Sequence, residues 1–366
     1  MKKVLFLVNR DFVLYNFRFE LAEQLIGKGY EVYISLPYGP KVDEMVEKGC
    51  RFYPVSIDKR GKNPIKDLKL MEEYRKLFSV ISPDVVLSYT TKVNIYSGMI
   101  AGKMKIPYIM NISGLGTAVE TPGPLQKIVL QMYRQAAKNA HCLFFQNRNN
   151  WDFFEEKKIC GKNRRLICGS GVNLQRWTVM DYPRDDTIEF LFIARIIKEK
   201  GIEEYLDVAE RIKKEYSNTV FHVLGPCDGE YGRILDEKHK AGVIEYHGMV
   251  ADTRPFLEKA HCTIHPSYYP EGISNVLLET AACGRPAITT DRSGCKETVE
   301  SGVTGYIVEA KNRQQLYESV IHFLKLSNEE RKQMGLAARR KVEREFDRDT
   351  VVLAYMEEIE NIINGL

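Results

Sequence analysis

The sequence lacks the features of metal-stabilised, disulfide-stabilised and membrane-spanning proteins. Its eight cysteines form no Cys-x-x-Cys pair and show no metal-ligand spacing, so we expect reduced, mostly buried thiols and no metal. No run reaches the roughly 18 apolar residues of a membrane-spanning helix. Asn9-Arg10-Asp11 ends the first apolar run too early for a signal sequence. The sequence therefore predicts a cytoplasmic protein, with only peripheral contact at the cytoplasmic face of a membrane.

Common nucleotide-binding motifs are also absent. No Gly-x-x-x-x-Gly-Lys-Ser/Thr segment occurs, which argues against a P-loop NTPase. Gly114-Leu115-Gly116 begins like a dinucleotide fingerprint, but Val119 stands where the third glycine belongs, which argues against a dehydrogenase. Asp347-Arg348-Asp349 has the spacing of a metal-binding Asp-x-Asp, yet it precedes a predicted helix, where aspartate is an ordinary cap. There is no internal repeat and no low-complexity segment.

Charge is distributed unevenly along the chain. Residues 1–175 hold 27 Lys and Arg against 16 Asp and Glu, whereas the remainder holds 26 against 33. A basic first half indicates an anionic partner such as a membrane surface or a lipid-linked pyrophosphate. A solvated basic face without a partner is the alternative. We expect no nucleic-acid partner, because no nucleic-acid-binding module is recognisable.

The 366 residues suffice for two domains, and strands alternate with helices as in α/β proteins with parallel sheets. The pattern starts afresh near residue 173, which predicts two doubly wound lobes with ligands beyond the carboxyl ends of their strands. The expected strands are 4–8, 31–35, 84–88, 108–112, 142–146, 188–194, 219–224, 243–246, 262–265 and 287–290. The expected helices are 16–28, 64–79, 95–104, 124–139, 202–216, 312–326, 328–345 and 349–363.

The segment from Pro270 to Glu279 is the most informative part of the chain. It holds two carboxylates, a glycine turn and the start of a helix that Ser274 is expected to cap. Eight residues separate Glu271 from Glu279, which leaves about 80° between them on a helix, so Glu271 belongs to the loop. The helix N-terminus between them suits a phosphate, and each carboxylate suits sugar hydroxyls. A surface pair is the alternative, but Glu279 lies in an apolar helix where an acid needs a partner. The segment therefore predicts a nucleotide-sugar site.

Other strand-end loops of the second half add to this site. Arg195 and Lys200 follow one predicted strand and together suit a diphosphate, although alone each could be a surface cation. Gly225 allows a ligand to approach the backbone. Met249 and Val250 offer backbone groups to a base edge. Loops after parallel strands meet at one edge of a sheet, so we expect these residues to converge.

These motifs, with Gly171-Val172-Asn173, resemble retaining glycosyltransferase family 4, of the GT-B fold. The resemblance implies two Rossmann-like lobes that face each other across a cleft. The first lobe would hold residues 1–172 and 347–366, and the second residues 173–346. The closing helix would cross back to the first lobe. The resemblance also implies a UDP-sugar donor substrate and no cofactor. Arg195 and Lys200 would hold the diphosphate, Glu271 the donor sugar and Glu279 the ribose. The backbone at Gly272, Ile273, Ser274 and Asn275 would face phosphate and sugar.

The first half resembles bacterial N-acetylgalactosaminyltransferases that act on undecaprenyl-diphospho-sugars. The resemblance rests on segments 60–64, 89–96 and 111–117. It implies a polyprenyl-diphosphate-linked sugar acceptor. The acceptor-side candidates are Asn16, Arg60, Lys62, Lys92, Asn94, Gly114, Gly116 and Thr117. Many family members carry a first-lobe histidine near the reacting sugar, but His141, the only candidate here, precedes a buried strand and is expected to be structural. Ser113–Thr117, Glu120 and Asn94 are candidates for its place.

One first-half helix, expected at 124–139, is both basic and apolar. Lys127, Arg134 and Lys138 flank its apolar residues and would suit an anionic membrane surface. A core-facing helix with a solvated basic side is the alternative.

The sequence thus predicts transfer of a hexose or N-acetylhexosamine, with N-acetylgalactosamine (GalNAc) as the best candidate, to a lipid-linked sugar with retention of configuration. A UDP-sugar epimerase of the same fold and a non-catalytic nucleotide-sugar-binding protein are the alternatives. Product formed only when an acceptor is present distinguishes the transferase from both.

Overall fold

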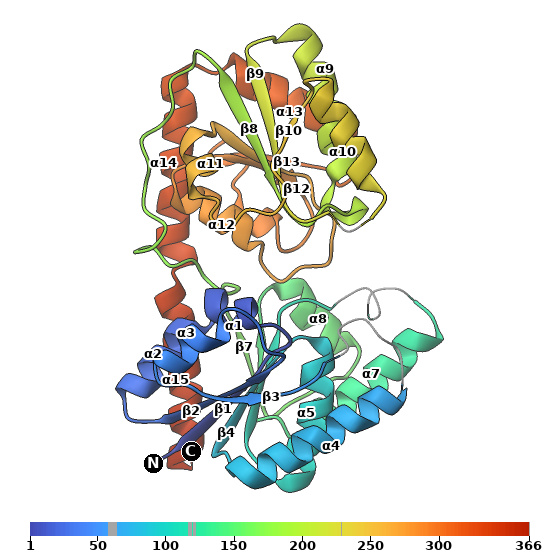
Figure 1. The fold of residues 1–366 in the computed structure, drawn as a ribbon, viewed down its shortest axis with the longest axis vertical. Helices are drawn as coiled ribbons and strands as arrows, with labels where there is room; N and C mark the ends of the chain where they lie inside the picture. The colour runs from blue at the N-terminus through green and yellow to red at the C-terminus, as the bar shows by residue number, and fades with distance from the viewer. Residues whose placement is uncertain (58–63, 116–118, 120–121, 228, 366) are drawn as a thin grey trace. The chain divides into compact units, whose positions relative to one another are not determined.

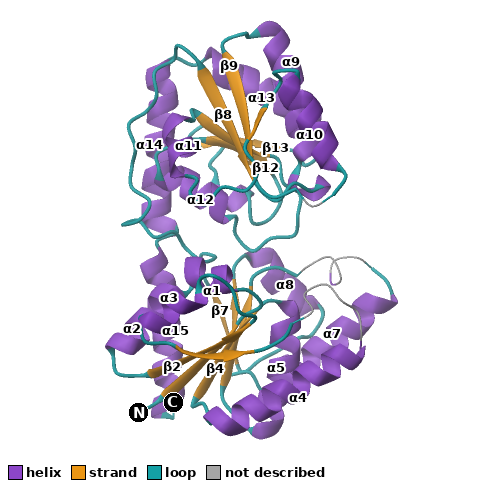
Figure 2. Cartoon of the chain, in the orientation of Figure 1, coloured by secondary structure: helices purple, strands orange, loops and turns teal. Residues whose placement is uncertain are grey.

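The computed structural model describes residues 1–57, 64–115, 119, 122–227 and 229–365. Contacts along the chain divide it into two compact units, Met1–Ser170 with Asp349–Leu366, and Gly171–Arg348 (Figure 1). The boundaries expected from the sequence lie two residues from these. Each unit is an α/β fold built on one parallel sheet (Figure 2).

The first unit contains a seven-stranded sheet in the order β3-β2-β1-β4-β5-β6-β7, with every pairing parallel. Its central strands are almost continuously apolar because helices cover both faces. The strands are β1 (Lys3–Leu7), β2 (Glu31–Leu36), β3 (Arg51–Pro54), β4 (Val85–Tyr89), β5 (Tyr108–Ile112), β6 (Cys142–Phe145) and β7 (Asn163–Leu166).

Two layers of helices bury this sheet. One core lies under α4, α5, α7 and α8 and includes Tyr74 and Phe154, and the other lies under α1, α2, α3 and α15 and includes Tyr355. The helices are α1 (Asp11–Phe17), α2 (Phe19–Gly27), α3 (Val42–Glu47), α4 (Pro64–Ile81), α5 (Thr91–Met104), α7 (Pro124–Ala137), α8 (Arg148–Glu156) and α15 (Arg348–Asn364).

The second unit contains a six-stranded parallel sheet in the order β10-β9-β8-β11-β12-β13. Its core under α9, α10 and α13 is built on Phe190, Tyr205 and Phe323. The strands are β8 (Ile188–Ile193), β9 (Thr219–Leu224), β10 (Glu245–Tyr246), β11 (Cys262–His265), β12 (Ala287–Thr290) and β13 (Gly305–Val308). The helices are α9 (Ile202–Glu215), α10 (Tyr231–Lys240), α11 (Arg254–Lys259), α12 (Asn275–Ala282), α13 (Arg313–Lys325) and α14 (Asn328–Glu345), with 3₁₀ turns η1 (Lys198–Lys200) and η2 (Lys296–Thr298).

The prediction of one helix over residues 16–28 was wrong, because the helix starts earlier and is not continuous. The chain is already helical from Asp11, and it breaks at Arg18, whose backbone leaves helical geometry at φ −143° and ψ 0°. The Arg18 side chain is buried, and its guanidinium carbon lies 5.4 Å from the ring centre of Tyr89 and 5.7 Å from that of Tyr355. Apolar periodicity does not reveal such a break, because the residues on either side still face the same core. The short elements α3, β3, α8, β7 and β13 were also missed.

The described residues contain no helix that is both long and apolar enough to cross a membrane.

Candidate functional site

The loops after β8 and β11 meet in the second unit. Lys200 ends η1, and its ammonium group forms an ion pair with the carboxylate of Glu271, both side chains being largely buried at 11% and 15% exposure. Gly201 permits this approach, because a Cβ there would lie 2.2 Å from the backbone oxygen of Pro266, and its φ of +79° also favours glycine. The Tyr268 N–H donates to the Glu199 oxygen at 2.9 Å and joins the two loops.

Tyr269 lies against both predicted diphosphate-binding cations. The guanidinium carbon of Arg195 is 5.3 Å from the centre of its ring, and Nζ of Lys200 is 5.1 Å from it. The ring thus orders two cations that would otherwise repel each other. The sequence analysis missed Tyr269, although its place two residues before Glu271 in the loop was an available signal. Arg195 and Lys200, which were expected to hold the diphosphate, therefore lie beside one aromatic side chain, and Glu271 joins them through its ion pair with Lys200.

Two neighbouring charges act in opposite directions on Lys200. Burial lowers the pKa of its ammonium to about 8, and the neighbouring Arg195 acts in the same direction as burial. The Glu271 carboxylate favours the charged form. A bound phosphate in place of that carboxylate would have the same effect, so this ammonium is suited to exchange one anion for another.

The start of α12 differs from expectation in one respect. Ser274 occupies the position before the helix, but its side chain does not cap it, and the predicted cap was wrong. Its hydroxyl instead lies 3.3 Å from Nε2 of His265, at the end of β11. The first-turn N–H groups of α12 are therefore not taken by this hydroxyl. The Gly294 oxygen accepts from the Ser274 N–H at 2.8 Å and so fixes the loop before the helix.

Two unpartnered buried polar atoms lie at this helix start. His265 is fully buried, and burial together with Lys200 lowers its pKa to about 3, so its ring is neutral. Neither its Nδ1 nor Oδ1 of Asn275 has a hydrogen-bond partner among the residues that the structure describes. Buried polar atoms without partners are costly, and a polar ligand would satisfy them. His265 was not among the residues expected from sequence. Of the remaining predicted backbone contacts, Gly272 and Ile273 are both buried.

Glu279 lies in the second turn of α12, as predicted. Burial raises the pKa of its carboxyl to about 7, while Arg348 and Arg176 act in the opposite direction. The sequence analysis assigned neither arginine to this site, because both lie far from Glu279 along the chain. The carboxyl is thus near its titration point at neutral pH, where it can accept or donate a hydrogen bond.

The predicted base-side residues follow β9 and β10. Gly225 has φ +144°, and a Cβ there would lie 1.7 Å from the Ala194 oxygen, so only glycine allows the ends of β8 and β9 to come this close. Its N–H donates to the Gly248 oxygen at 2.7 Å. The Met249 side chain is 79% exposed and Val250 is half-buried. This loop therefore exposes its backbone groups and the Met249 thioether, which agrees with a surface that a nucleotide base could reach.

The acceptor-side candidates do not form one cluster in the described part of the first unit. Nζ of Lys92 pairs with Oδ1 of Asp67 at 2.7 Å. Asn94 is buried and donates to the Asn111 oxygen at 2.8 Å, which fastens α5 to β5. Asn16 is half-buried on α1, and Gly114 follows β5. The candidates Arg60, Lys62, Gly116 and Thr117 lie outside the described residues, as does Glu120.

His141 and most of the helix α7 contribute to the packing of the first unit. Nε2 of His141 lies 3.1 Å from Oε2 of Glu358 in α15, as expected of a structural histidine. In α7, Leu130 and Tyr133 are buried in the core, so the apolar face points mainly inward, although Leu125 and Ile128 are exposed at its start.

Two glycosyltransferase families match the chain. The family described as Glycosyl transferase 4-like matches residues 3–147, and Glycosyl transferases group 1 matches residues 181–341. Each match lies within one structural unit. Together they cover the whole second sheet, six of the seven strands of the first sheet, and Arg195, Lys200, Glu271 and Glu279.

Curated relatives and solved structures give the same fold and class. The chain is 23% identical over 99% of its length to the Campylobacter jejuni N,N'-diacetylbacillosaminyl-diphospho-undecaprenol alpha-1,3-N-acetylgalactosaminyltransferase, of which 99% is covered. It is 28% identical to the Staphylococcus aureus capsular polysaccharide biosynthesis glycosyltransferase CapM over 49% of this chain and 47% of that protein. The crystal structure of Anabaena HepE with UDP and glucose superposes with a TM-score of 0.80 at 14% identity, covering 99% of this chain and 100% of that one.

Proposed function

Since the chain belongs to the family 4 glycosyltransferases of the GT-B fold, we propose that it transfers a sugar from a UDP-sugar to a polyprenyl-diphosphate-linked sugar, with retention of anomeric configuration. The observation that supports this is the placement of Arg195 and Lys200 beside the Tyr269 ring, with Glu271 paired to Lys200. GalNAc is the proposed donor sugar, because the relative that matches over its full length is named for that transfer.

The donor would lie across the described strand-end loops. Its diphosphate would take the place of the Glu271 carboxylate beside Lys200, and Arg195, which lies beside the same Tyr269 ring, would also hold it. Glu271, released from Lys200, would accept hydrogen bonds from the donor sugar. The ribose hydroxyls would reach Glu279, and Gly225, Met249 and Val250 would face the base. These groups come from the loops that follow β8, β9, β10 and β11, and from the helix α12.

The proposed step breaks the bond from the anomeric carbon to the diphosphate oxygen and forms a bond from that carbon to the acceptor oxygen. The acceptor hydroxyl attacks from the face that the diphosphate leaves, and its proton passes to the departing phosphate oxygen. Arg195 and Lys200 stabilise the negative charge that develops there, which is the largest contribution in many such reactions. These cations supply the charge that a divalent metal provides elsewhere, so we propose that added Mg²⁺ or Mn²⁺ leaves the rate unchanged.

We also propose peripheral binding to an anionic membrane through the first unit, at the cytoplasmic face where lipid-linked acceptors would be presented. Ile65 and Leu68 at the start of α4, and Leu125 and Ile128 at the start of α7, are exposed at 77%, 66%, 39% and 58%. Lys66, Lys69 and Lys127 are exposed in the same helical turns. Apolar side chains ringed by lysines are typical of surfaces that bind anionic lipid.

The direct test is a turnover screen of UDP-sugars against polyprenyl-diphospho-sugars, with mass spectrometry of the lipid product. We expect product only when donor and acceptor are both present, with UDP-GalNAc as the preferred donor and an α linkage by NMR. An isomerised nucleotide-sugar formed without acceptor would favour an epimerase. Binding of UDP-sugars without any turnover would favour a non-catalytic role, and either result would overturn the proposal.

A further inference from the structure

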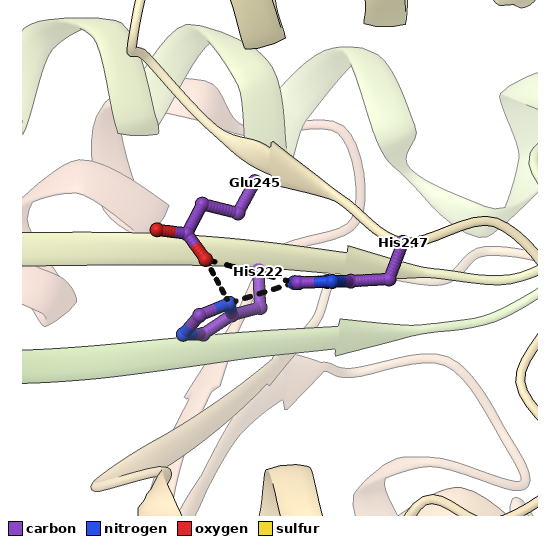
Figure 3. A group of neighbouring side chains, drawn as sticks. All are labelled: His222, Glu245 and His247. Atoms are coloured by element: carbon purple, nitrogen blue, oxygen red, sulfur yellow. Dashed lines mark hydrogen bonds and ion pairs between the residues drawn. The ribbon is translucent and has the colours of Figure 1, made fainter.

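A second cluster of functional side chains lies at the outer edge of the second sheet. Nδ1 of His222, Nε2 of His247 and Oε2 of Glu245 face one another (Figure 3). His222 lies on β9, and Glu245 lies opposite it on β10. His247 follows β10 directly and extends its pairing, since its N–H donates to the Val223 oxygen at 3.0 Å. Neither the family nor the proposed transfer reaction accounts for these three side chains.

The distances fit a tetrahedral metal ion. Nδ1 of His222 is 3.0 Å from Nε2 of His247 and 3.3 Å from Oε2 of Glu245, and the last two atoms are 3.8 Å apart. Zinc bonds of about 2.0–2.1 Å at tetrahedral angles place neighbouring ligand atoms about 3.3–3.4 Å apart. The three atoms therefore surround a point that each could reach without a large movement of the backbone.

The hydrogen bonds around His222 leave a lone pair at that point. Its Nε2 lies 3.0 Å from Oε2 of Glu189 on β8, so Nε2 carries the proton that this carboxylate accepts. Nδ1 is then an acceptor, which can accept from the Nε2–H of His247 at 3.0 Å while no ion is bound, and the Glu245 carboxylate 3.3 Å away is an acceptor too. A cation that replaced the His247 proton would lie between all three ligand atoms. A carboxylate that holds the far nitrogen of a ligand histidine is also the usual support of a zinc-bound imidazole.

Charge and exposure agree with an ion that enters from solvent. Glu189 and Glu245 bring two carboxylates to this cluster, and a divalent cation would balance their charge. The side chains of His222, His247 and Glu245 are 9%, 27% and 51% exposed, so the ion would be anchored on the buried side and open to water on the other. Phe256 of α11 packs against the His247 ring, with ring centres 4.7 Å apart, and restricts its rotation.

We propose that His222, His247 and Glu245 bind one divalent transition-metal ion, with Glu189 as the outer partner and water as the fourth ligand. Imidazole nitrogens with a carboxylate favour Zn²⁺ among the available metals. The ion would clamp the two-residue edge strand β10 onto β9. It would thereby hold the loop that follows, where the Gly248 oxygen accepts from the Gly225 N–H at 2.7 Å.

A different set of possible ligands, His265, Glu271 and Cys295, lies in the donor site. There the Lys200 ammonium already pairs with Glu271, and a second cation would have to displace it. Cobalt distinguishes the two sites, because a Co²⁺–thiolate bond adds a strong charge-transfer absorption and a site of imidazole and carboxylate does not.

The test is titration of the metal-stripped full-length chain with ZnCl₂ by calorimetry, with bound zinc counted by mass spectrometry. We expect one Zn²⁺ per chain and a higher melting temperature on binding. His247→Gln should weaken binding by at least about 100-fold and Glu189→Gln by roughly 10–100-fold, the range measured when outer partners are lost. Both side chains are partly exposed, so these variants should fold. The matched control, His322→Gln on α13, removes a histidine that packs only on Tyr306 and should bind as the wild type does.

Three results would overturn the proposal. They are no bound zinc in the wild type, unchanged binding by a folded His247→Gln chain, and a thiolate-to-cobalt band on Co²⁺ addition. None of these readouts depends on transferase activity, so the failure of this proposal and the failure of the proposed function are separable.

Discussion

The two units share a parallel-sheet architecture but differ in how they use their charged side chains. In the second unit Arg195 and Lys200 both lie beside the Tyr269 ring, and Lys200 pairs with Glu271. In the described part of the first unit the candidate cation Lys92 pairs with Asp67, which also accepts from the Tyr96 hydroxyl at 2.7 Å. Both lysines thus pair with a carboxylate, but only Lys200 has a second candidate cation beside the same aromatic ring.

This difference indicates which unit determines the choice of acceptor. A diphosphate is the same in every nucleotide-sugar, so short loops after consecutive strands of one sheet suffice to hold it. The acceptor varies between relatives. Several of the first unit's candidates lie in segments 58–63 and 116–121, which fall mainly outside the described residues. We therefore expect substitutions in the second unit to change rate, and those in the first to change partner.

The largest expected effect is that of Lys200→Met, which keeps the aliphatic stem and removes the charge. Loss of one preorganised group that stabilises the departing charge costs about 10²–10³-fold in kcat, so we expect a fall of that size. Steady-state turnover with saturating donor measures it.

The matched control is Lys198→Met, in the same 3₁₀ turn. Its side chain is 62% exposed and pairs only loosely with Glu203, at 3.6 Å, so turnover should stay within about twofold of the wild type. Unchanged turnover in a folded Lys200→Met chain would reject the role assigned to Lys200. Equal losses in both variants would mean that the turn is merely sensitive to its charge.

A smaller effect is expected from Glu279, through pH. Its pKa is raised from 4.5 to about 7, so the folded chain holds a proton that the unfolded chain releases between these values. The free energy of unfolding should therefore fall as pH rises from about 4.5 to 7 and then level off, with this carboxyl contributing about 2–3 kcal/mol of that fall. Glu279→Gln should flatten the profile. Urea unfolding at pH 5, 6, 7 and 8 measures it, and an equally steep fall in the variant would contradict the assignment.

Local pattern was sufficient to predict the strands and loops of the second unit. Strand 262–265 and helix 328–345 agree with β11 and α14, and the loops that carry Arg195, Lys200 and Glu271 were placed correctly because each follows a clear apolar strand. Contacts that depend on the tertiary fold could not be predicted from the sequence. Tyr269 and His265 matter because of what packs beside them, and Arg348 reaches Glu279 from the far end of the second unit. The His222 cluster likewise depends on strand register, which pairs residues 222 and 245 across a long separation.

The smallest expected effect concerns the first unit alone. Ile128 is 58% exposed on α7 beside the exposed Lys127, and burying such a side chain in lipid contributes about 1 kcal/mol, so Ile128→Asn should weaken binding to anionic vesicles about fivefold. Val80→Asn is the control, because Val80 is 69% exposed but lies at the opposite end of α4 from Leu68. Co-sedimentation with phosphatidylglycerol vesicles measures both.

Turnover with a short-chain, water-soluble acceptor should be unchanged in Ile128→Asn, because the donor residues all belong to the other unit. If both variants bound vesicles as the wild type does, the first turn of α7 would not be a membrane contact, and its exposed apolar residues would have to meet the acceptor lipid or another protein instead.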